Sequence, residues 1–382
     1  SIMLVYCIGR SQPWKETILA PRPLWASLYE AHKGLGAKIV SFHGWLLPIQ
    51  YTSIIEEHNA TRTKAGLFDI SHLGKLEVSG ESAKPFLQKV FTNNIDKAVP
   101  GRIVYSPFCN ERGGILDDVF IYNAGGDRYI LIVNASTFEN DLAWFNSHNG
   151  AGASIKDIND SLGGIALQGP ESEKILTGLC DADLTAVKHR SFVETKVCGH
   201  YALLSRTGYT GEDGFEMFVP SGKSAEIWNA ILSAGRPYGL IPAGLGSRDT
   251  LRLEAGCPLY GTDTDETKTP IETGLMWAVD MGKDFIGKSA IAERAAAGAK
   301  ERLAAFEMLD RAIPRTGYAV EKGGSAIGTV TSGSYSPTLK KNIGFAYITP
   351  GNAAAGNAID IVVHSERKKA VVVKAPFYRR RK

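Results

Sequence analysis

Hydrophobic positions along the chain follow two different periods. Residues 114–134 hold two apolar stretches on either side of the polar, glycine-rich segment 123–127, a pattern typical of a β-hairpin. In residues 170–179 and 224–234 the apolar positions recur every three or four residues, which predicts helices. Strand and helix patterns do not alternate strictly along the chain. The sequence therefore indicates the α+β class rather than a regular βαβ repeat.

Two further patterns bear on the division of the chain. Residues 76–83 and 165–172 each show a strand and a glycine turn leading into an apolar helix, which favours two related half-domains, although so common a unit can also recur by chance. Residues 282–302 are rich in Ala and Lys, and short strands separated by glycines follow them. This change predicts a separate, smaller β-domain from about residue 300 to residue 378.

Composition narrows the class of protein. The chain has 382 residues, 44% of them hydrophobic, and no apolar run approaches the roughly 20 residues that a membrane helix needs. Its 43 basic and 40 acidic residues nearly balance, which argues against a nucleic-acid partner. The five scattered cysteines form no C-x-x-C pair and indicate reduced thiols in a cytosol-like compartment. Residues 1–22 are expected to be an N-terminal extension without a clear secretory signal.

Asp117 and Asp118 are adjacent acids in a segment that otherwise has the pattern of a buried strand. Successive strand side chains point to opposite faces, so the two cannot act together as an acid–base dyad. A buried carboxylate needs a partner, and at least one of the two is expected to meet water, a cation or a ligand. Periodicity does not decide which one, because both faces carry apolar neighbours. The alternative is that both lie near a strand end and are simply solvated.

A second group of polar residues lies in the glycine-rich segment 205–216. Glu216 falls in a strand pattern, where its carboxylate is suited to accept two N–H hydrogen bonds from a heterocycle such as a pterin. The commoner meaning of such a segment is a glycine turn with solvated acids. Further on, residues 242–254 fit a helix start with internal ion pairs, which leaves Arg248 free for a ligand if Asp249 turns away.

Several other common sites do not occur in the sequence. The eight histidines show no H-E-x-x-H or paired spacing and no cysteine stands near them, so a metal enzyme is not expected. Residues 242–254 match neither glycine-rich nucleotide motif, and no G-x-S-x-G elbow of a hydrolase is found.

Taken together, several ordered blocks resemble the aminomethyltransferase (T-protein) family of the glycine cleavage system. The resemblance covers about residues 23 to 379. The blocks that carry it are residues 35–38, 44–45, 51–58, 66–72, 110–118, 205–216, 242–254 and 331–338.

The resemblance implies a fold, a reaction and a partner. The expected fold is α+β and multi-domain, with a folate-binding aminomethyltransferase domain of two related lobes at residues 23–281 and a C-terminal β-barrel domain at residues 299–378, arranged around a central channel. The family moves the methylene of an aminomethyl group from the lipoylated H-protein to tetrahydrofolate and releases ammonia. Tetrahydrofolate is thus the expected co-substrate, and no metal, nucleic acid or membrane is expected to take part.

Site residues follow from the same resemblance, position by position. The family's catalytic aspartate corresponds to Asp118, which favours the second acid of the pair. The expected folate contacts are Tyr105, Asn134, Tyr209, Glu216 and Arg248, with Arg379 as a weaker correspondence because the C-terminal end varies in length. Leu73 stands at a folate-contact position where a methionine is common, and residues 42–48 also depart from the family pattern. Both departures concern the packing of the pterin rather than the reaction.

Two other functions are compatible with the same fold. One is a folate-dependent demethylase, which is often fused to a flavin domain for which this chain has no room. The other is a non-catalytic folate-binding protein of iron–sulfur cluster assembly, whose K-G-C-Y type of motif is replaced here by residues 254–260. The expected compartment is the cytoplasm if the source is bacterial, or the mitochondrial matrix if it is eukaryotic.

Overall fold

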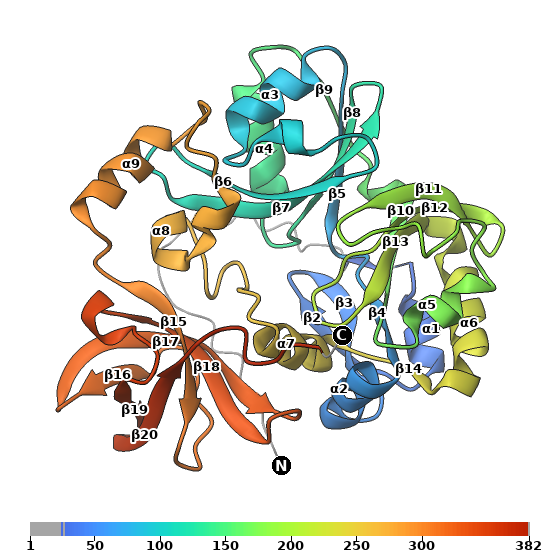
Figure 1. Ribbon diagram of the computed structural model, residues 1–382. Coiled ribbons are helices and arrows are strands. Elements are labelled where there is room, and N and C mark those ends of the chain that lie inside the picture. The colour runs from blue at the N-terminus through green and yellow to red at the C-terminus, as the bar shows by residue number, and fades with distance from the viewer. Residues whose placement is uncertain (1–23, 26, 381–382) are drawn as a thin grey trace.

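The computed structural model describes residues 24–25 and 27–380. Three lobes surround a common centre: two contain a β-sheet covered by helices, and the third is a β-barrel (Figure 1). The predicted α+β class and its C-terminal barrel are therefore confirmed. The expected N-terminal extension, residues 1–22, lies outside the described residues. Among the described residues, no helix is long and apolar enough to span a membrane.

The first lobe is built on a six-stranded sheet with the order β11-β12-β13-β10-β4-β14. Apolar residues on one face of this sheet pack against two helices, α5 (Ser172–Thr177) and α6 (Ser224–Gly235). Helix α5 lies within the predicted segment 170–179, and α6 extends one residue beyond the predicted segment 224–234. The strands are β4 (Ala65–Asp69), β10 (Leu162–Gln168), β11 (Phe192–Val197), β12 (His200–Ser205), β13 (Gly214–Pro220) and β14 (Leu240–Pro242).

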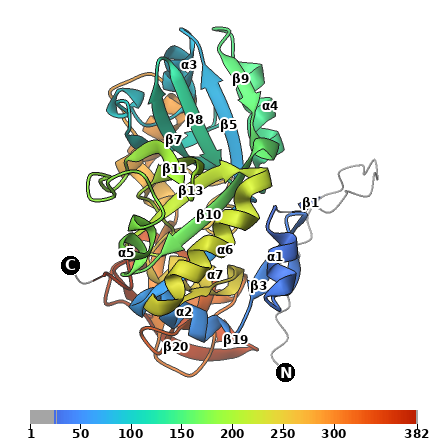
Figure 2. The ribbon, with the colours of Figure 1, turned by 90° about the vertical axis from the view of Figure 1, so that its right-hand side faces the viewer.

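A smaller group of N-terminal elements lies beside this lobe (Figure 2). It contains a three-stranded sheet with the order β1-β3-β2 and two helices. Its elements are β1 (Leu24–Trp25), α1 (Tyr29–Gly34), β2 (Lys38–Phe42), β3 (Trp45–Gln50) and α2 (Ile54–Thr63).

The second lobe is a five-stranded sheet with the order β6-β7-β8-β5-β9. The predicted hairpin at residues 114–134 forms its β7 (Ile115–Gly125) and β8 (Arg128–Val133). The remaining elements are β5 (Gly74–Ser79), α3 (Ala83–Val90), β6 (Ile103–Cys109), α4 (Phe138–His148) and β9 (Ser154–Asp157). Helices α3 and α4 cover the face of the sheet opposite the first lobe.

The two sheets pack against each other through a shared apolar cluster. Phe68 and Phe218 from the first lobe meet Tyr122 and Ile132 from the second, and all four are buried. The segments predicted to resemble each other form β5 with α3 in one lobe and β10 with α5 in the other. The order of layers is therefore helix, sheet, sheet, helix.

The barrel is closed by six strands in the order β15-β18-β17-β16-β19-β20 and has its own apolar core. Two helices, α8 (Pro270–Thr273) and α9 (Lys288–Ala297), lie in the connection that leads to it, and α9 falls within the Ala- and Lys-rich residues 282–302. The strands are β15 (Arg302–Met308), β16 (Ala319–Lys322), β17 (Ser325–Ser336), β18 (Lys341–Ile348), β19 (Ala358–Val363) and β20 (Glu366–Val373).

Helix α7 (Leu245–Glu254) joins the barrel to the first lobe. Arg252 forms a buried ion pair with Asp263 at 2.7 Å and donates a hydrogen bond of 3.0 Å to the hydroxyl of Ser332 in the barrel. Glu254 accepts hydrogen bonds from the hydroxyl of Ser336 and the backbone N–H of Thr338. The C-terminal end of α7 is thereby fixed to the barrel.

Candidate functional site

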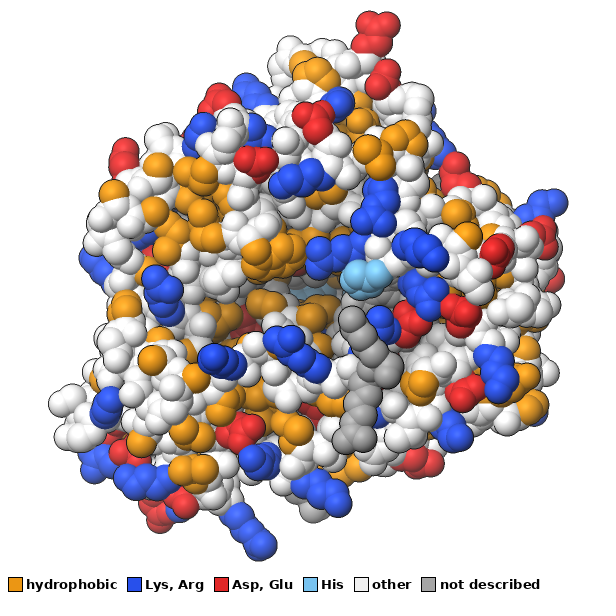
Figure 3. All heavy atoms as spheres, viewed as in Figure 1, with side chains coloured by type: hydrophobic (Ala, Val, Ile, Leu, Met, Phe, Trp, Pro, Cys, Tyr) orange, Lys and Arg blue, Asp and Glu red, His pale blue; other side chains and the backbone are white. Residues whose placement is uncertain are grey.

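The predicted site residues lie mostly around the centre, where the lobes meet. Figure 3 shows a hollow in the middle of one face, with Lys and Arg side chains around its rim. Strand β7 contributes to the site from the second lobe, while β13 and α7 contribute from the first. Each of these elements is fixed by its own core, so the polar side chains are held by rigid neighbours.

Asp117 is fully buried, which excludes the alternative that both acids of the pair are solvated. Its carboxylate accepts hydrogen bonds from the backbone N–H of Asn134 at 3.0 Å, the Asn134 amide at 2.6 Å and the Thr137 hydroxyl at 2.9 Å. All three donors come from the turn between β8 and α4. Asp117 is thus occupied by its own chain and is not available to a ligand.

Asp118 is only half-buried and faces a different set of side chains. The same Asn134 amide nitrogen lies 3.5 Å from its Oδ1, and Tyr105 lies within hydrogen-bonding reach. Burial, followed by the neighbouring charge of Asp117, raises the pKa of Asp118 to about 7. A carboxyl group with that pKa can hold or release a proton near neutral pH, which is the property that a catalytic acid or base needs.

An aromatic stack stands next to Asp118. The ring of Tyr105 lies parallel to that of Trp277, with centroids 5.2 Å apart and an angle of 13° between planes. Trp277 is 57% exposed, and the guanidinium of Arg190 lies 5.3 Å from the centroid of its ring. Flat rings with one open face offer a stacking surface for a planar ligand.

Glu216 lies on the face of β13 that looks toward the second lobe, between the two sheets. It pairs with Ala166 of β10 and Ser205 of β12 in the sheet register and is 6% exposed. The hydroxyl of Thr207 donates a hydrogen bond of 2.6 Å to its Oε2. Burial raises the pKa of the Glu216 carboxyl. Desolvation therefore leaves this carboxylate in need of further positive or N–H partners.

Arg248 lies near Glu216, in the first turns of α7. Its guanidinium lies 4.9 Å from the centroid of the Tyr209 ring, and it forms no side-chain hydrogen bond or ion pair with any described residue. Asp249 is engaged by Arg252 at 2.8 Å, which leaves Arg248 free, as the sequence allowed. A half-buried guanidinium without an ion-pair partner is an open position for an anion or a carbonyl group of a ligand.

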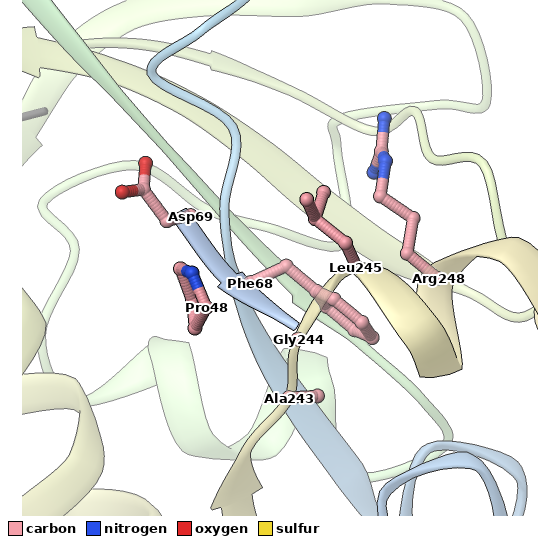
Figure 4. A pocket seen from close by; sticks show the side chains of 7 residues that line it. All are labelled: Pro48, Phe68, Asp69, Ala243, Gly244, Leu245 and Arg248. Carbon is pink, nitrogen blue, oxygen red and sulfur yellow. The ribbon is translucent and has the colours of Figure 1, made fainter. Parts of the chain in front are cut away.

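A small pocket lies below this guanidinium (Figure 4). Asp69 and Arg248 stand at its opposite ends, with apolar side chains between them. Asp69 is paired with His32 at 2.8 Å and accepts a hydrogen bond from the backbone N–H of Ser71, so Arg248 alone of the two is unpaired within the described chain. The lining residues are Pro48, Phe68, Asp69, Ala243, Gly244, Leu245 and Arg248.

The remaining predicted residues, Leu73, Tyr209 and Arg379, differ in their burial and in their contacts. Leu73 is half-buried against the apolar cluster between the sheets, to which Ala166 and Phe218 belong. The hydroxyl of Tyr209 donates a 2.6 Å hydrogen bond to the backbone carbonyl of Pro258. Arg379 is exposed, and its side chain forms no hydrogen bond or ion pair with another described residue. Its neighbour Tyr378 stacks on Arg62 instead.

Sequence reasoning missed two residues of the site and one residue buried behind it. Trp277, Thr207 and Asp141 each touch a predicted residue, namely Tyr105, Glu216 and Asp117 in that order. Thr207 could have been found as a hydroxyl in the glycine-rich segment. Trp277 and Asp141 lie in stretches without a motif, so their proximity to the site depends on tertiary packing alone.

The donor set suits a folate-like molecule. A buried carboxylate, an unpaired guanidinium and an open aromatic stack match the N–H edge, the carbonyl groups and the rings of such a ligand. Among residues 24–25 and 27–380, no group of three or more His, Cys, Asp or Glu side chains is arranged to hold a metal ion. The burial of Cys257 raises the pKa of its thiol to about 11, which keeps it in the unreactive thiol form.

Comparisons with known proteins show which family the chain resembles. The family model of the GCVT N-terminal domain matches residues 28–283, and that of the glycine cleavage T-protein C-terminal barrel domain matches residues 301–379. Over 356 residues the chain is 46% identical to an aminomethyltransferase of Bacillus subtilis, covering 92% of this chain and 98% of that protein. An aminomethyltransferase of Halothermothrix orenii is 45% identical over 351 residues, with 92% and 98% covered.

A solved structure shows the same fold. The crystal structure of the glycine cleavage system aminomethyltransferase T from Bartonella henselae aligns with a TM-score of 0.88 and 29% sequence identity. The alignment covers 94% of this chain and 98% of that one.

Proposed function

Because the chain belongs to the glycine cleavage T-protein family, as the sequence predicted, we propose that it is a tetrahydrofolate-dependent aminomethyltransferase. It takes the methylene of the aminomethyl group carried on the lipoyl arm of a carrier protein, passes it to tetrahydrofolate and releases ammonia. The observation that carries this proposal is the grouping of Asp118, Glu216 and Arg248 around one centre in a chain of this family. The demethylase and the iron–sulfur assembly protein have no comparable support.

Asp118 is the catalytic residue in this proposal. Tetrahydrofolate, when bound, supplies the amine nitrogens that accept the carbon. The carboxylate of Asp118 stabilises the positive charge that develops when ammonia leaves, and it accepts the proton that ring closure releases. Its pKa of about 7 lets it return that proton to solvent at neutral pH.

Glu216, Arg248 and Tyr105 hold the folate in the proposed site. Glu216 accepts N–H groups of the pterin on the carboxylate edge that Thr207 does not occupy, and Arg248 donates to an acceptor of the same ligand. The stack of Tyr105 and Trp277 supports a ring next to Asp118. Asn134, Tyr209 and Leu73 complete the contacts, while Arg379 is placed at the outer end of the ligand.

The proposed partner is a lipoylated H-protein. The pKa of His189 is lowered first by its burial and then by the positive charges of three nearby arginines. These are Arg102, Arg190 and Arg380. A cluster of cations of this kind attracts an acidic surface or the anionic end of a folate. The proposed compartment is the cytoplasm if the source is bacterial and the mitochondrial matrix if it is eukaryotic; the relatives reported above are bacterial.

A direct assay tests the proposed function. The protein is incubated with tetrahydrofolate and aminomethylated H-protein, and ammonia and 5,10-methylenetetrahydrofolate are followed. Asp118→Asn keeps the size of the side chain but removes its charge, so turnover should fall by roughly 10²–10⁴ while folate binding stays nearly intact. Asp181→Asn, at an exposed position, is the matched control and should behave as wild type. A wild-type protein that releases no ammonia, or an Asp118→Asn variant with normal turnover, would contradict the proposal.

A further inference from the structure

Three aspartates lie together behind the proposed active site, and only one of them belongs to it. Asp117 is 0% exposed and Asp141, in the first turn of α4, is 2% exposed. Neither forms an ion pair with a Lys, Arg or His side chain of the described chain. The carboxyl groups of Asp141 and Asp117 are within hydrogen-bonding reach of each other, and the Oδ2 atom of Asp141 is buried without an assigned hydrogen-bond partner among the described residues.

Two buried carboxyl groups in contact cannot both be ionised without a cation. Burial raises the pKa of Asp117, but Asp117 accepts three hydrogen bonds, from Asn134 twice and from Thr137, and these stabilise its negative charge. Asp141 has only the Thr137 hydroxyl within reach as a side-chain donor, and burial together with the charge of Asp117 raises the pKa of Asp141 to about 11. The proton therefore resides on Asp141, which donates it in a hydrogen bond to Asp117.

The Asn134 amide connects this pair to Asp118. One Asn134 N–H group donates to Asp117 at 2.6 Å. The same nitrogen lies 3.4 Å from the backbone carbonyl oxygen of Asp118 and 3.5 Å from its Oδ1, so the second N–H group points toward Asp118. The orientation of the Asn134 amide thus depends on Asp117 keeping its charge, and that charge depends on the hydrogen donated by Asp141.

We propose that Asp141 is a positioning residue for the reaction: its protonated carboxyl group keeps Asp117 ionised, and Asp117 in turn orients the Asn134 amide against Asp118. This inference rests on the proposed function. It assigns a role to a helix residue that has no contact with the ligand site itself. The charge held on Asp117 also keeps Asp118 ready to take up a proton near neutral pH, because like charges disfavour each other.

Other titratable groups around the cluster do not compete for this role. Burial raises the pKa of each of them, so all are neutral near pH 7, and they come from β6, from the glycine-rich segment and from the chain after α7. They are Tyr105, Tyr209, Cys257 and Tyr260. The titration near neutral pH therefore belongs to the three aspartates, which act as one coupled set.

Two variants of Asp141 separate positioning from mere packing. Asp141→Asn keeps a donor to Asp117, whereas Asp141→Ala removes it and favours protonation of Asp117. In wild type, kcat/KM should rise with pH through about 7 as Asp118 ionises. In Asp141→Ala this limb should move to lower pH by about one unit or more, because the charge next to Asp118 is lost. Asp141→Asn should restore the wild-type limb, and Glu139→Gln, an exposed acid in the same helical turn, is the matched control.

A measurement without turnover keeps the two proposals apart. Carbon-13 NMR of the aspartate carboxyl groups reports the titration of Asp118 in the free protein, and thermal unfolding reports stability. If wild type lacks turnover, the proposed function fails, while the carboxyl titrations still test the inference. If Asp141→Ala only lowers the melting temperature and leaves the Asp118 titration unchanged, or if Asp141→Asn behaves like Asp141→Ala, the positioning role is wrong.

Discussion

Asp118 and Glu216 are both strand carboxylates, yet their surroundings give them different tasks. Burial, followed by the charge of the neighbouring Asp117, brings the pKa of Asp118 to about 7. Glu216 is enclosed between two sheets, with Thr207 as its hydrogen-bond donor. A group with a tuned pKa suits proton transfer, whereas an enclosed carboxylate suits binding.

Glu216→Gln tests the binding role. The substitution keeps the shape of the side chain but replaces a charge-assisted hydrogen bond with a neutral one, so folate affinity should weaken by about 1.5–3 kcal/mol. Calorimetric titration with tetrahydrofolate measures the change. Glu226→Gln, on the exposed side of α6, serves as the control and should bind as wild type does. An unchanged affinity in Glu216→Gln would remove this residue from the site.

Candidate site residues could be predicted from the sequence where they stand in a recognisable motif. The adjacent acids and the carboxylate of Glu216 could be singled out from the sequence, but strand periodicity could not say which aspartate is held by hydrogen bonds within the chain. That choice depends on the turn between β8 and α4, which supplies Asn134 and Thr137 to Asp117. For the same reason the sequence could not show whether Arg248 is free of an ion pair. This depends on the partner of Asp249, which only the fold identifies as Arg252.

At the scale of elements, the turn between β12 and β13 packs tightly against β10. The side chain of Gln168 of β10 fills the space beside the glycines of this turn. Its amide accepts from the Thr210 hydroxyl at 2.9 Å and donates to the Thr207 carbonyl at 3.1 Å. A Cβ atom at Gly214 would lie 2.5 Å from the carbonyl oxygen of Leu167. These glycines therefore allow close packing of β10 against the turn.

Gly214→Ala should accordingly destabilise the fold rather than block a ligand. The added methyl group overpacks the contact with β10, which costs about 1–3 kcal/mol, and it displaces the strand that carries Glu216. Urea unfolding measures the loss of stability. Gly222→Ala is the control, because a Cβ atom there meets nothing within 4 Å. A Gly214→Ala protein with wild-type stability and weakened folate binding would show instead that these glycines border the ligand site.

Elements with strong local hydrophobic patterns could be predicted from the sequence, but the closure of the barrel could not. The hairpin of β7 and β8 and the helices α5 and α6 lie where the apolar periods indicated. The closed barrel, in contrast, requires β16 to pair with β19 and β15 with β20. Such pairings join segments far apart in the sequence, and no local period encodes them.

At the scale of the whole molecule, a chain of buried charges holds the lobes together. Glu254 at the end of α7 pairs with Arg62 of α2 at 2.9 Å and with His58 at 3.2 Å, and both its side chain and that of His58 are fully buried. It also accepts hydrogen bonds from Ser336 and Thr338 of the barrel lobe. One carboxylate therefore links three parts of the chain, and it also fixes the helix that carries Arg248.

Loss of the Glu254 charge should loosen this link. Hydrogen bonds and the charges of His58 and Arg62 outweigh the burial of Glu254 and lower its pKa to about 2. Because the folded pKa lies below the unfolded value of about 4.5, its contribution to stability is present above pH 4.5 and is lost as the pH falls toward 2. Glu254→Gln should lose about 1–3 kcal/mol at neutral pH, because buried hydrogen-bond donors lose a charged acceptor, although Arg62 keeps its ion pair with Glu212 at 2.8 Å.

Chemical unfolding at several pH values measures this effect, with Glu293→Gln on the exposed side of α9 as the control. Wild type should lose stability between pH 4.5 and 2, and Glu254→Gln should lose less over the same interval because the titrating group is gone. Since α7 carries Arg248, folate affinity should fall in the same variant although Glu254 touches no part of the proposed ligand site. A Glu254→Gln protein that keeps both its stability at neutral pH and its folate affinity would show that the barrel is held to the first lobe by its apolar contacts instead.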